Sequence, residues 1–195
     1  NYDVPARVIV SNVAGQGIAS EIKQATTALW NLDAEFLVSS RTCCGLINSY
    51  YMAEQLGIDR WMAMVAAFRM TKSPVIVIDC GTAVTIDMVN KKGVFVGGVI
   101  MPGLNTAIQS LKVGTDAIEE IPDTGHFNSV TALTTDQAVK AGVLYGLTGG
   151  IERVVSEHAL TDKTAARVFI TGGDAEKLLP YLTVPVVFQA DLVLQ

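Results

Sequence analysis

A cluster of small and charged side chains follows one of the most apolar runs of the sequence. Asp79, Gly81 and Thr82 come directly after residues 75–78, whose apolar side chains are typical of a buried strand. Glycine lets the backbone turn tightly so that N–H groups face an anion, and the threonine hydroxyl adds a donor. Asp79 cannot itself bind a phosphate, since both groups are negative, but beside one it would hold a cation. The alternative is a plain β-hairpin in which Asp and Gly only form the turn.

A second chemical motif, Asp59 and Arg60, lies at the predicted start of a helix. Asp59 is suited to cap that helix, which is the simplest interpretation of an acid in this place. Arg60, however, places a cation at the positive end of the helix dipole, which is unfavourable unless an anion binds there. We therefore predict that Arg60 binds a carboxylate or phosphate and that Asp59 accepts a hydroxyl proton from the same substrate.

Two further motifs are candidates for the lining of a binding site. Tyr50, nine residues before Asp59, combines a flat apolar ring with a hydroxyl, although a half-buried core tyrosine is the simpler explanation. Gly172 and Gly173 follow a strand-like run and would let a nucleotide base or sugar approach the backbone. An ordinary turn between a strand and a helix, with Asp174 as the cap, would explain the same residues.

These motifs need a scaffold of strands and helices, and the hydrophobic periodicity supplies one. It predicts strands at residues 7–13, 34–40, 75–79, 83–89, 94–100 and 166–171, and helices at 18–30, 59–70, 104–112, 135–158 and 176–182. The long helix has a possible interruption at Gly149 and Gly150, residues 112–131 are predicted to be a loop, and residues 186–194 to be extended. An antiparallel meander followed by helices and returning strands favours a mixed-sheet α/β fold, with a boundary between residues 1–72 and 73–195.

The composition restricts the class of protein. The chain of 195 residues has a formal net charge of −5 and no segment that concentrates Lys and Arg, so a nucleic-acid-binding surface is not expected. No apolar run is long enough to span a membrane and no signal peptide is recognisable, which predicts a cytoplasmic protein. Cys43, Cys44 and Cys80 lack the spacing of a metal site and are expected to be reduced side chains that fill space.

Taken together, four segments resemble the type III pantothenate kinases. They are "GLINSYYMAEQLGIDRWMAMVAA", "VIVIDCGTAVTIDMVNKKGVFVGGVIMPGL", "TTDQAVKAG" and "FITGGDAEKL", in this order, within residues 45–194. The resemblance implies an α/β fold of the actin, hexokinase and Hsp70 type, with two ribonuclease-H-like halves and the ligands in the cleft between them. It also implies a homodimer that transfers the γ-phosphate of ATP to the primary hydroxyl of pantothenate, the first step of coenzyme A biosynthesis.

The same resemblance implies roles for residues on the pantothenate side. Asp59 is implied to be the general base, within a pantothenate-binding loop that consists of Gly57, Ile58, Asp59 and Arg60. Tyr50 is implied to be a further pantothenate contact. Thr135 matches a pantothenate contact that is supplied across the dimer interface.

On the nucleotide side, Asp79 matches the family's ligand for a monovalent cation, K⁺ or NH₄⁺. Thr82, beside Gly81, matches a contact to the phosphates of ATP, and Mg²⁺ is expected to accompany the nucleotide. Gly172 and Gly173 are assigned to the same ATP site, because a glycine pair directly after a strand would let the nucleotide approach the backbone.

One family motif, the first phosphate loop D-x-G-N-[ST], has no counterpart in the sequence. The N-terminal half is therefore expected to be incomplete. Either the chain is part of a longer protein, which we favour, or this polypeptide cannot bind ATP and Mg²⁺ properly. Two other functions stay open at this point: a phosphotransferase or phosphohydrolase of another specificity on the same fold, and a non-catalytic paralogue that acts as a regulatory or accessory binding protein.

Overall fold

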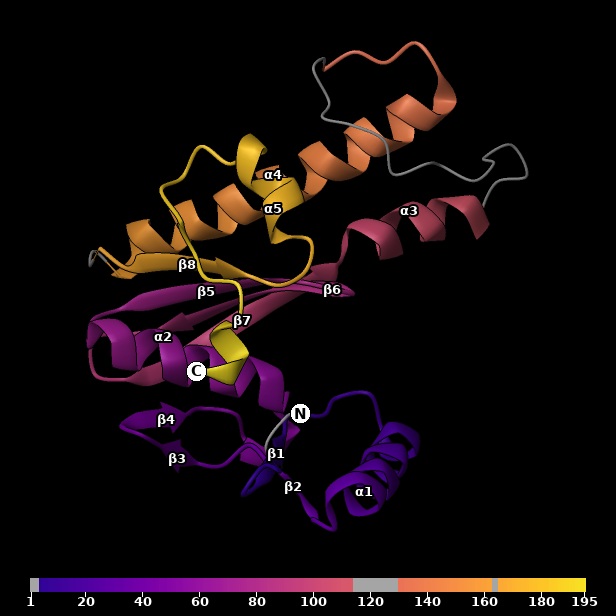
Figure 1. Ribbon diagram of the computed structural model, residues 1–195. Coiled ribbons are helices and arrows are strands. Elements are labelled where there is room, and N and C mark those ends of the chain that lie inside the picture. The colour runs from indigo at the N-terminus through magenta and orange to yellow at the C-terminus, as the bar shows by residue number, and fades with distance from the viewer. Residues whose placement is uncertain (1–3, 114–129, 163–164) are drawn as a thin grey trace.

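The computed structural model describes residues 4–113, 130–162 and 165–195 (Figure 1). The strands are β1 (Val8–Val10), β2 (Ala34–Phe36), β3 (Thr42–Cys43), β4 (Leu46–Asn48), β5 (Val75–Cys80), β6 (Ala83–Val89), β7 (Val94–Pro102), β8 (Arg167–Thr171) and β9 (Val187–Phe188). The helices are α1 (Gln16–Trp30), α2 (Ile58–Thr71), α3 (Leu104–Val113), α4 (Thr135–Asp162) and α5 (Ala175–Leu178), with short 3₁₀ helices at Ala53–Gln55, Leu179–Tyr181 and Leu192–Leu194.

A seven-stranded mixed sheet forms the centre of the molecule, with the strand order β3-β4-β7-β6-β5-β8-β9. β5, β6 and β7 form the predicted antiparallel meander, and β8 then returns parallel to β5 with β9 beside it. A meander continued by parallel strands on the far side of its first strand is the ribonuclease-H-like arrangement that the resemblance implied. The α/β fold prediction is therefore confirmed.

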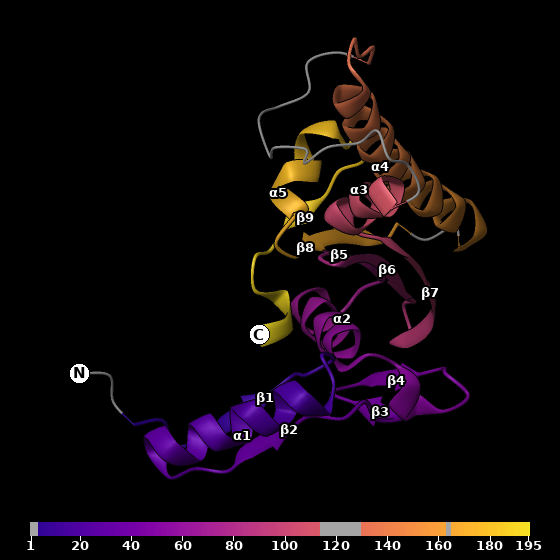
Figure 2. The ribbon, with the colours of Figure 1, turned by 90° about the vertical axis from the view of Figure 1, so that its right-hand side faces the viewer.

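Both faces of the sheet are covered, which explains why β5 is an unbroken apolar run rather than an alternating one. Val75 and Val77 belong to a core that contains Trp61 and Met64 of α2. Ile76 and Ile78 point to the opposite face, into a second core with the apolar side chains of α4. Figure 2 shows α2 and α4 on the two sides of the sheet. The two helices thus fix β5, and with it the Asp79 turn, from both sides.

The N-terminal elements form a small unit of their own. β1 and β2 pair in parallel as a two-stranded sheet, with α1 connecting them. The helix prediction is confirmed, but its large apolar residues are for the most part not covered by the described part of the chain: Ile18 is 42% exposed, Leu29 70% and Trp30 39%. A pattern of apolar spacing thus identified the helix without identifying a buried face.

Two local predictions differ from the structure, and two others cannot be tested by it. α4 runs without interruption through Gly149 and Gly150, where a side chain at Gly150 would approach the Met101 sulfur to 3.1 Å, so glycine permits close packing on β7. Of residues 186–194 only β9 is a strand, followed by a 3₁₀ helix. Most of the predicted loop at 112–131 lies outside the described residues. The boundary between residues 72 and 73 stays a prediction.

Candidate active site

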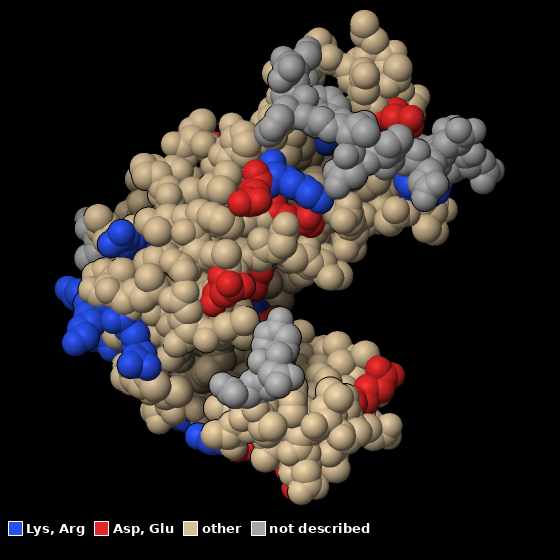
Figure 3. Space-filling view, viewed as in Figure 1, with Lys and Arg blue, Asp and Glu red and all other residues tan. Residues whose placement is uncertain are grey.

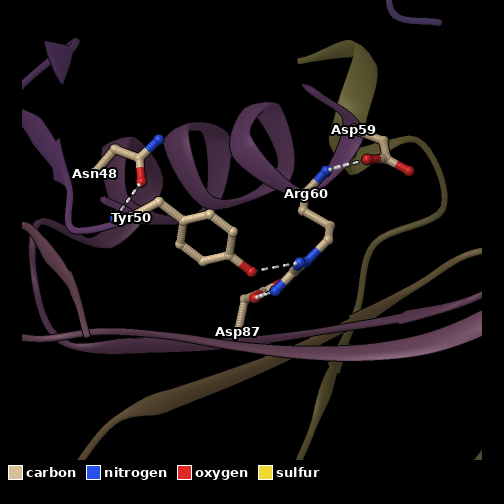
Figure 4. Close-up of polar contacts among 5 residues, drawn as sticks. All are labelled: Asn48, Tyr50, Asp59, Arg60 and Asp87. Atoms are coloured by element: carbon tan, nitrogen blue, oxygen red, sulfur yellow. Dashed lines mark hydrogen bonds and ion pairs between the residues drawn. The ribbon is translucent and has the colours of Figure 1, made fainter. Parts of the chain in front are cut away.

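Arg60 is held by a carboxylate that the sequence motifs did not single out. Arg60 Nε donates to Asp87 Oδ2 at 2.9 Å and Nη2 donates to Oδ1 at 2.5 Å, while Nη1 donates to the Tyr50 hydroxyl at 3.2 Å (Figure 4). Both charged side chains are buried, Arg60 with 7% and Asp87 with 1% of its surface exposed. The pair joins the first turn of α2 to the middle of β6 in the sheet.

Glycine on the neighbouring strand makes room for this pair. Asp87 is paired with Gly98 of β7, where an added Cβ would lie 2.2 Å from Asp87 Oδ1 and 2.7 Å from Arg60 Nη2. Burial lowers the pKa of Arg60, but the hydrogen bond and the attraction of Asp87 outweigh it, so the net shift is upward and the guanidinium stays charged. A buried arginine paired in this way is a fixed positive charge.

Asp59 lies in the first turn of α2 and is half-buried. Gly57 occupies the cap position, so the interpretation of Asp59 as the helix cap is wrong. Asp59 Oδ1 instead accepts the N–H of Arg60 at 2.8 Å, which turns the carboxylate toward the start of the helix. An acid held at this place by one oxygen is suited to accept a proton from a hydroxyl that docks at the helix N-terminus.

The segment that carries Tyr50 is held through its main chain. The Arg41 guanidinium donates to the carbonyl oxygens of Asn48 at 2.6 Å, Tyr50 at 2.8 Å and Tyr51 at 3.0 Å. The N–H of Tyr50 donates to Asn48 Oδ1 at 3.0 Å, and the Tyr50 ring packs against Phe95 with the ring centroids 5.6 Å apart. These contacts set the Tyr50 hydroxyl beside Arg60.

Asp79 and Asp59 face the same region of the molecule. Burial raises the pKa of Asp79, and the negative charges of Asp59 and Asp87 raise it further. α2 packs along β5 and is joined to it by only three residues, 72–74, so the start of the helix lies beside the end of the strand. The Asp59 motif and the Asp79 motif therefore lie near each other, and their joint role in one binding site stays a prediction.

The two glycine turns lie side by side because β5 and β8 pair in parallel. Asp79 is in register with Thr171, so Gly172 follows next to it. Gly172 has a φ of +94°, and an added Cβ would lie 2.5 Å from Asp79 Oδ1 and 2.4 Å from the carbonyl oxygen of Cys80. Only glycine satisfies both the backbone conformation and the close approach.

A cavity of about 590 Å³ opens at this end of the sheet. It is lined by Gly81, Thr82, Asn105, Thr106, Gln109, Gly173 and Asp174. The N-terminal end of α3 is fixed to its wall, since Thr106 Oγ1 donates to the Thr82 carbonyl oxygen at 2.7 Å. Figure 3 shows the molecule deeply notched on its right-hand side, between the part that bears α3 and the α1–β1–β2 unit. The cavity presents hydroxyl, amide and carboxyl groups among largely apolar surface, and its size is suited to a small ligand.

Thr135 is the one predicted site residue that this chain does not bring to the others. It is the first residue of α4 and exposed, and α4 covers the opposite face of the sheet from α2 (Figure 2). The opposite case is that of residues which hold the candidate site together but which the sequence analysis did not name. They are Asp87, Gly98 and Arg41. The one available signal was Asp87, a charged residue inside a strand that is otherwise largely buried.

Two further features, a membrane-spanning helix and a metal site, were searched for among the described residues only. No helix among them is long and apolar enough to cross a membrane. No group of three or more His, Cys, Asp and Glu side chains in that part of the chain is arranged to hold a metal ion. A cation at Asp79 would therefore need oxygen ligands from the backbone, from water or from a bound phosphate, which suits a hard cation.

Comparison with known proteins identifies the family. The family model of the type III pantothenate kinases matches residues 1–157. A type III pantothenate kinase from Nitrosococcus oceani is 37% identical over 194 residues, which cover 97% of this chain and 73% of that protein. Its counterpart from Alkalilimnicola ehrlichii is 34% identical over 192 residues, which cover 98% of this chain and 76% of that protein.

A solved structure is also similar. It is that of a Campylobacter jejuni protein described as a Baf family transcriptional activator, with a TM-score of 0.58, 21% identity, and coverage of 96% of this chain and 78% of the other. At this identity the likeness concerns the fold alone. The sequence matches decide the family: the chain belongs to the type III pantothenate kinases.

Proposed function

We propose that the site between Asp59 and Asp79 is where this chain, a type III pantothenate kinase, transfers the γ-phosphate of ATP to the primary hydroxyl of pantothenate in coenzyme A biosynthesis. The observation that carries the proposal is the proximity of the two motifs, since Asp59 raises the pKa of Asp79 across the gap between α2 and β5. A phosphoryl transfer needs the acceptor hydroxyl and the phosphate in line at one place.

Pantothenate binds on the α2 side in this proposal. Its hydroxyl lies at Asp59, which accepts the proton as the general base, and the loop Gly57–Ile58–Asp59–Arg60 surrounds it. The Tyr50 hydroxyl and Arg60 Nη1 lie 3.2 Å apart and so present one polar surface to the substrate. Asp87 balances the charge of Arg60, so the pantothenate carboxylate is attracted by Arg60 Nη1, which does not bond to Asp87, together with the N–H groups at the start of α2.

ATP occupies the other side, with its phosphates against the turn of Gly81 and Thr82. Gly172 and Gly173 let the rest of the nucleotide approach the backbone at the cavity described above. Asp79 holds a monovalent cation, K⁺ or NH₄⁺, and Mg²⁺ accompanies the nucleotide. The charge of these cations offsets that of the phosphates during transfer. Burial and the neighbouring acids make Asp79 a carboxylate that gains from a bound cation.

The active form is a homodimer in the cytoplasm. Thr135 is exposed and belongs to the helix on the far side of the sheet from Asp59, so within one chain it does not reach the pantothenate loop. In a dimer the partner's copy supplies this contact. The proposal thereby accounts for a predicted binding residue that the single chain leaves apart.

The test is to measure the phosphorylation of pantothenate by a variant in which Asp59 is replaced. Asp59→Asn is expected to reduce kcat by ~10²–10⁴-fold with only a modest change in the KM for pantothenate, because an amide cannot accept the proton. Asp33→Asn, at an exposed acid between α1 and β2, is the matched control and is expected to keep wild-type rates. ATP turnover is measured with and without pantothenate.

The outcomes separate the alternatives. ATP hydrolysis that does not depend on pantothenate would indicate a phosphohydrolase. Calorimetric binding of neither ATP nor pantothenate would indicate a non-catalytic paralogue. An Asp59→Asn rate within threefold of wild type would remove Asp59 from the role of the base.

A further inference from the structure

Two thiols lie together at a place that the kinase site does not use. Cys43 ends β3 and Cys44 begins the turn to β4, and the two sulfur atoms are 3.5 Å apart. In a regular strand the side chains of consecutive residues point to opposite faces. Here Cys44 has a φ of +51° and Gly45 one of +91°, and this turn brings both sulfurs to the same side.

One of the two cysteines in this turn packs against the protein core, and the other is exposed to solvent. Cys43 is partly buried and packs against the core beneath α2, while Cys44 is exposed. Cys43 pairs with Leu46 across the hairpin, and the carbonyl oxygen of Gly45 lies so close to Gly93 that an added Cβ there would be 2.6 Å away. The pair of thiols is therefore held in place before any ligand arrives and is accessible through Cys44.

A disulfide between the two cysteines fits the geometry poorly. The Cα atoms of adjacent residues are about 3.8 Å apart across a trans peptide bond, whereas disulfides join Cα atoms about 4.4–6.8 Å apart. Burial and the neighbouring Cys44 raise the pKa of the Cys43 thiol, which keeps it protonated and slows attack on other disulfides. The pair is better suited to share one bound atom than to form a bond with each other.

The distance between the two sulfur atoms restricts which kind of atom both of them can bind. With bonds of about 2.3 Å to sulfur, a 3.5 Å separation corresponds to an angle of about 100° at the bound centre. A linear two-coordinate metal would hold the sulfurs about 4.6 Å apart. Zinc prefers four ligands, and among the described residues no third Cys, His, Asp or Glu joins the pair. A trivalent arsenic with one organic substituent is pyramidal and needs two sulfur ligands only.

We propose that Cys43 and Cys44 form a bidentate dithiol site for trivalent organoarsenicals. An arsenoxide R–As=O condenses with both S–H groups to give R–As(S)₂ bound to the two cysteines. Two As–S bonds form, the As=O bond and both S–H bonds break, and the oxygen leaves with the two protons as one water. No atom changes oxidation state, so neither an oxidant nor a reductant is required.

The experiment adds phenylarsine oxide to the reduced protein and reads the intact mass and the number of free thiols. We expect one adduct per chain, the loss of two of the three thiols, resistance to excess 2-mercaptoethanol, and release by 2,3-dimercaptopropanol. Cys43→Ser and Cys44→Ser should each abolish the stable adduct. Cys80→Ser, at a buried cysteine in β5, is the matched control and should retain it.

Other results would overturn the proposal. These are no adduct on the wild type, an adduct that 2-mercaptoethanol removes, or a stable adduct that survives in either single serine variant. Amide hydrogen exchange at residues 41–48 of the serine variants shows whether the hairpin is retained, so a folding defect is recognised. The outcome does not depend on the kinase assignment, because no assay of phosphate transfer is used.

Discussion

Arg60 and Asp87, 27 residues apart in the sequence, form a buried bidentate ion pair that joins helix α2 to strand β6. Through this pair the helix that begins with the proposed pantothenate loop is fixed to β6, the strand that follows the Asp79 turn. The two halves of the proposed reaction are therefore linked by one charged contact in addition to apolar packing.

The first prediction concerns this pair. Asp87→Asn leaves the Arg60 guanidinium buried without a counter-charge, and breaking such a pair costs about 3–5 kcal/mol. We expect the free energy of unfolding to fall by this amount. Because Arg60 then shifts to find another partner, the KM for pantothenate should rise at least about tenfold, or about 1.4 kcal/mol. Denaturant unfolding and steady-state kinetics measure the two effects.

Two control variants separate position from charge. Gly98→Ala keeps both charges but places a methyl group 2.2 Å from Asp87 Oδ1, so it should raise the pantothenate KM in the same way. Glu35→Gln breaks the exposed pair with Arg7 and should change stability far less. An equal rise in the KM for ATP would show that Asp87 supports the fold in general and not the pantothenate side.

The second prediction compares the adjacent glycines of the β8 turn. Gly172→Ala must adopt a φ of +94° and collide with Asp79 and Cys80, so we expect a loss of at least about 2 kcal/mol in the free energy of unfolding. An alanine at position 173 meets no atom within 4 Å and should unfold like the wild type. Equal denaturation midpoints for the two variants would contradict the described close approach.

The third prediction uses the raised pKa of Asp79. Since the folded state binds this proton more tightly than the unfolded chain, the contribution to stability is present below the ordinary value of 3.8 and is lost as the pH rises through the raised pKa. Without K⁺, the unfolding free energy of the wild type should therefore fall over this range relative to that of Asp79→Asn. Urea unfolding at a series of pH values measures the difference.

The same pair of proteins tests the cation. At neutral pH, K⁺ at five times its Kd should stabilise the wild type by about 1 kcal/mol. Asp79→Asn should show no such gain, and NaCl at equal ionic strength is the control. Equal stabilisation of both proteins by K⁺ would argue against a cation at Asp79.

The fourth prediction concerns Thr135 in a dimer. Thr135→Ala and Asp59→Asn are each expected to be poorly active alone. When both are unfolded together and refolded, each mixed dimer has one site with an intact Asp59 and the partner's intact Thr135. Random pairing should then restore about a quarter of the wild-type activity. Mixtures no more active than the separate variants would show that Thr135 acts within its own chain, or not at all.

Much of the scaffold was predictable because it depends on local patterns. The strands at 75–79 and 83–89 are short apolar runs separated by a glycine turn, and their antiparallel pairing follows from the turn. The proximity of Asp79 and Gly172 was not visible, because it depends on the parallel register of β5 and β8. That register is set by the two helical cores on either side of the sheet.

The sequence drew attention to residues of the candidate site but not to the contacts that hold them. Asp59 and Arg60 were recognised, yet the cap is Gly57, and Arg60 is directed to Asp87. A partner 27 residues away leaves no periodic signal, and the glycine that accommodates the pair lies on a third element. The roles of the site residues in binding and catalysis stay predictions until the variants are measured.

The three hydrogen bonds from Arg41 end on carbonyl oxygens, which every amino acid possesses. The path of the chain from Asn48 to Tyr51 is therefore independent of the side chain at position 51, which is fully exposed. A library of substitutions at this one position would therefore change the exposed surface next to Tyr50 while the loop keeps its course. The surface chemistry and the course of the backbone are thus separately adjustable along these few residues.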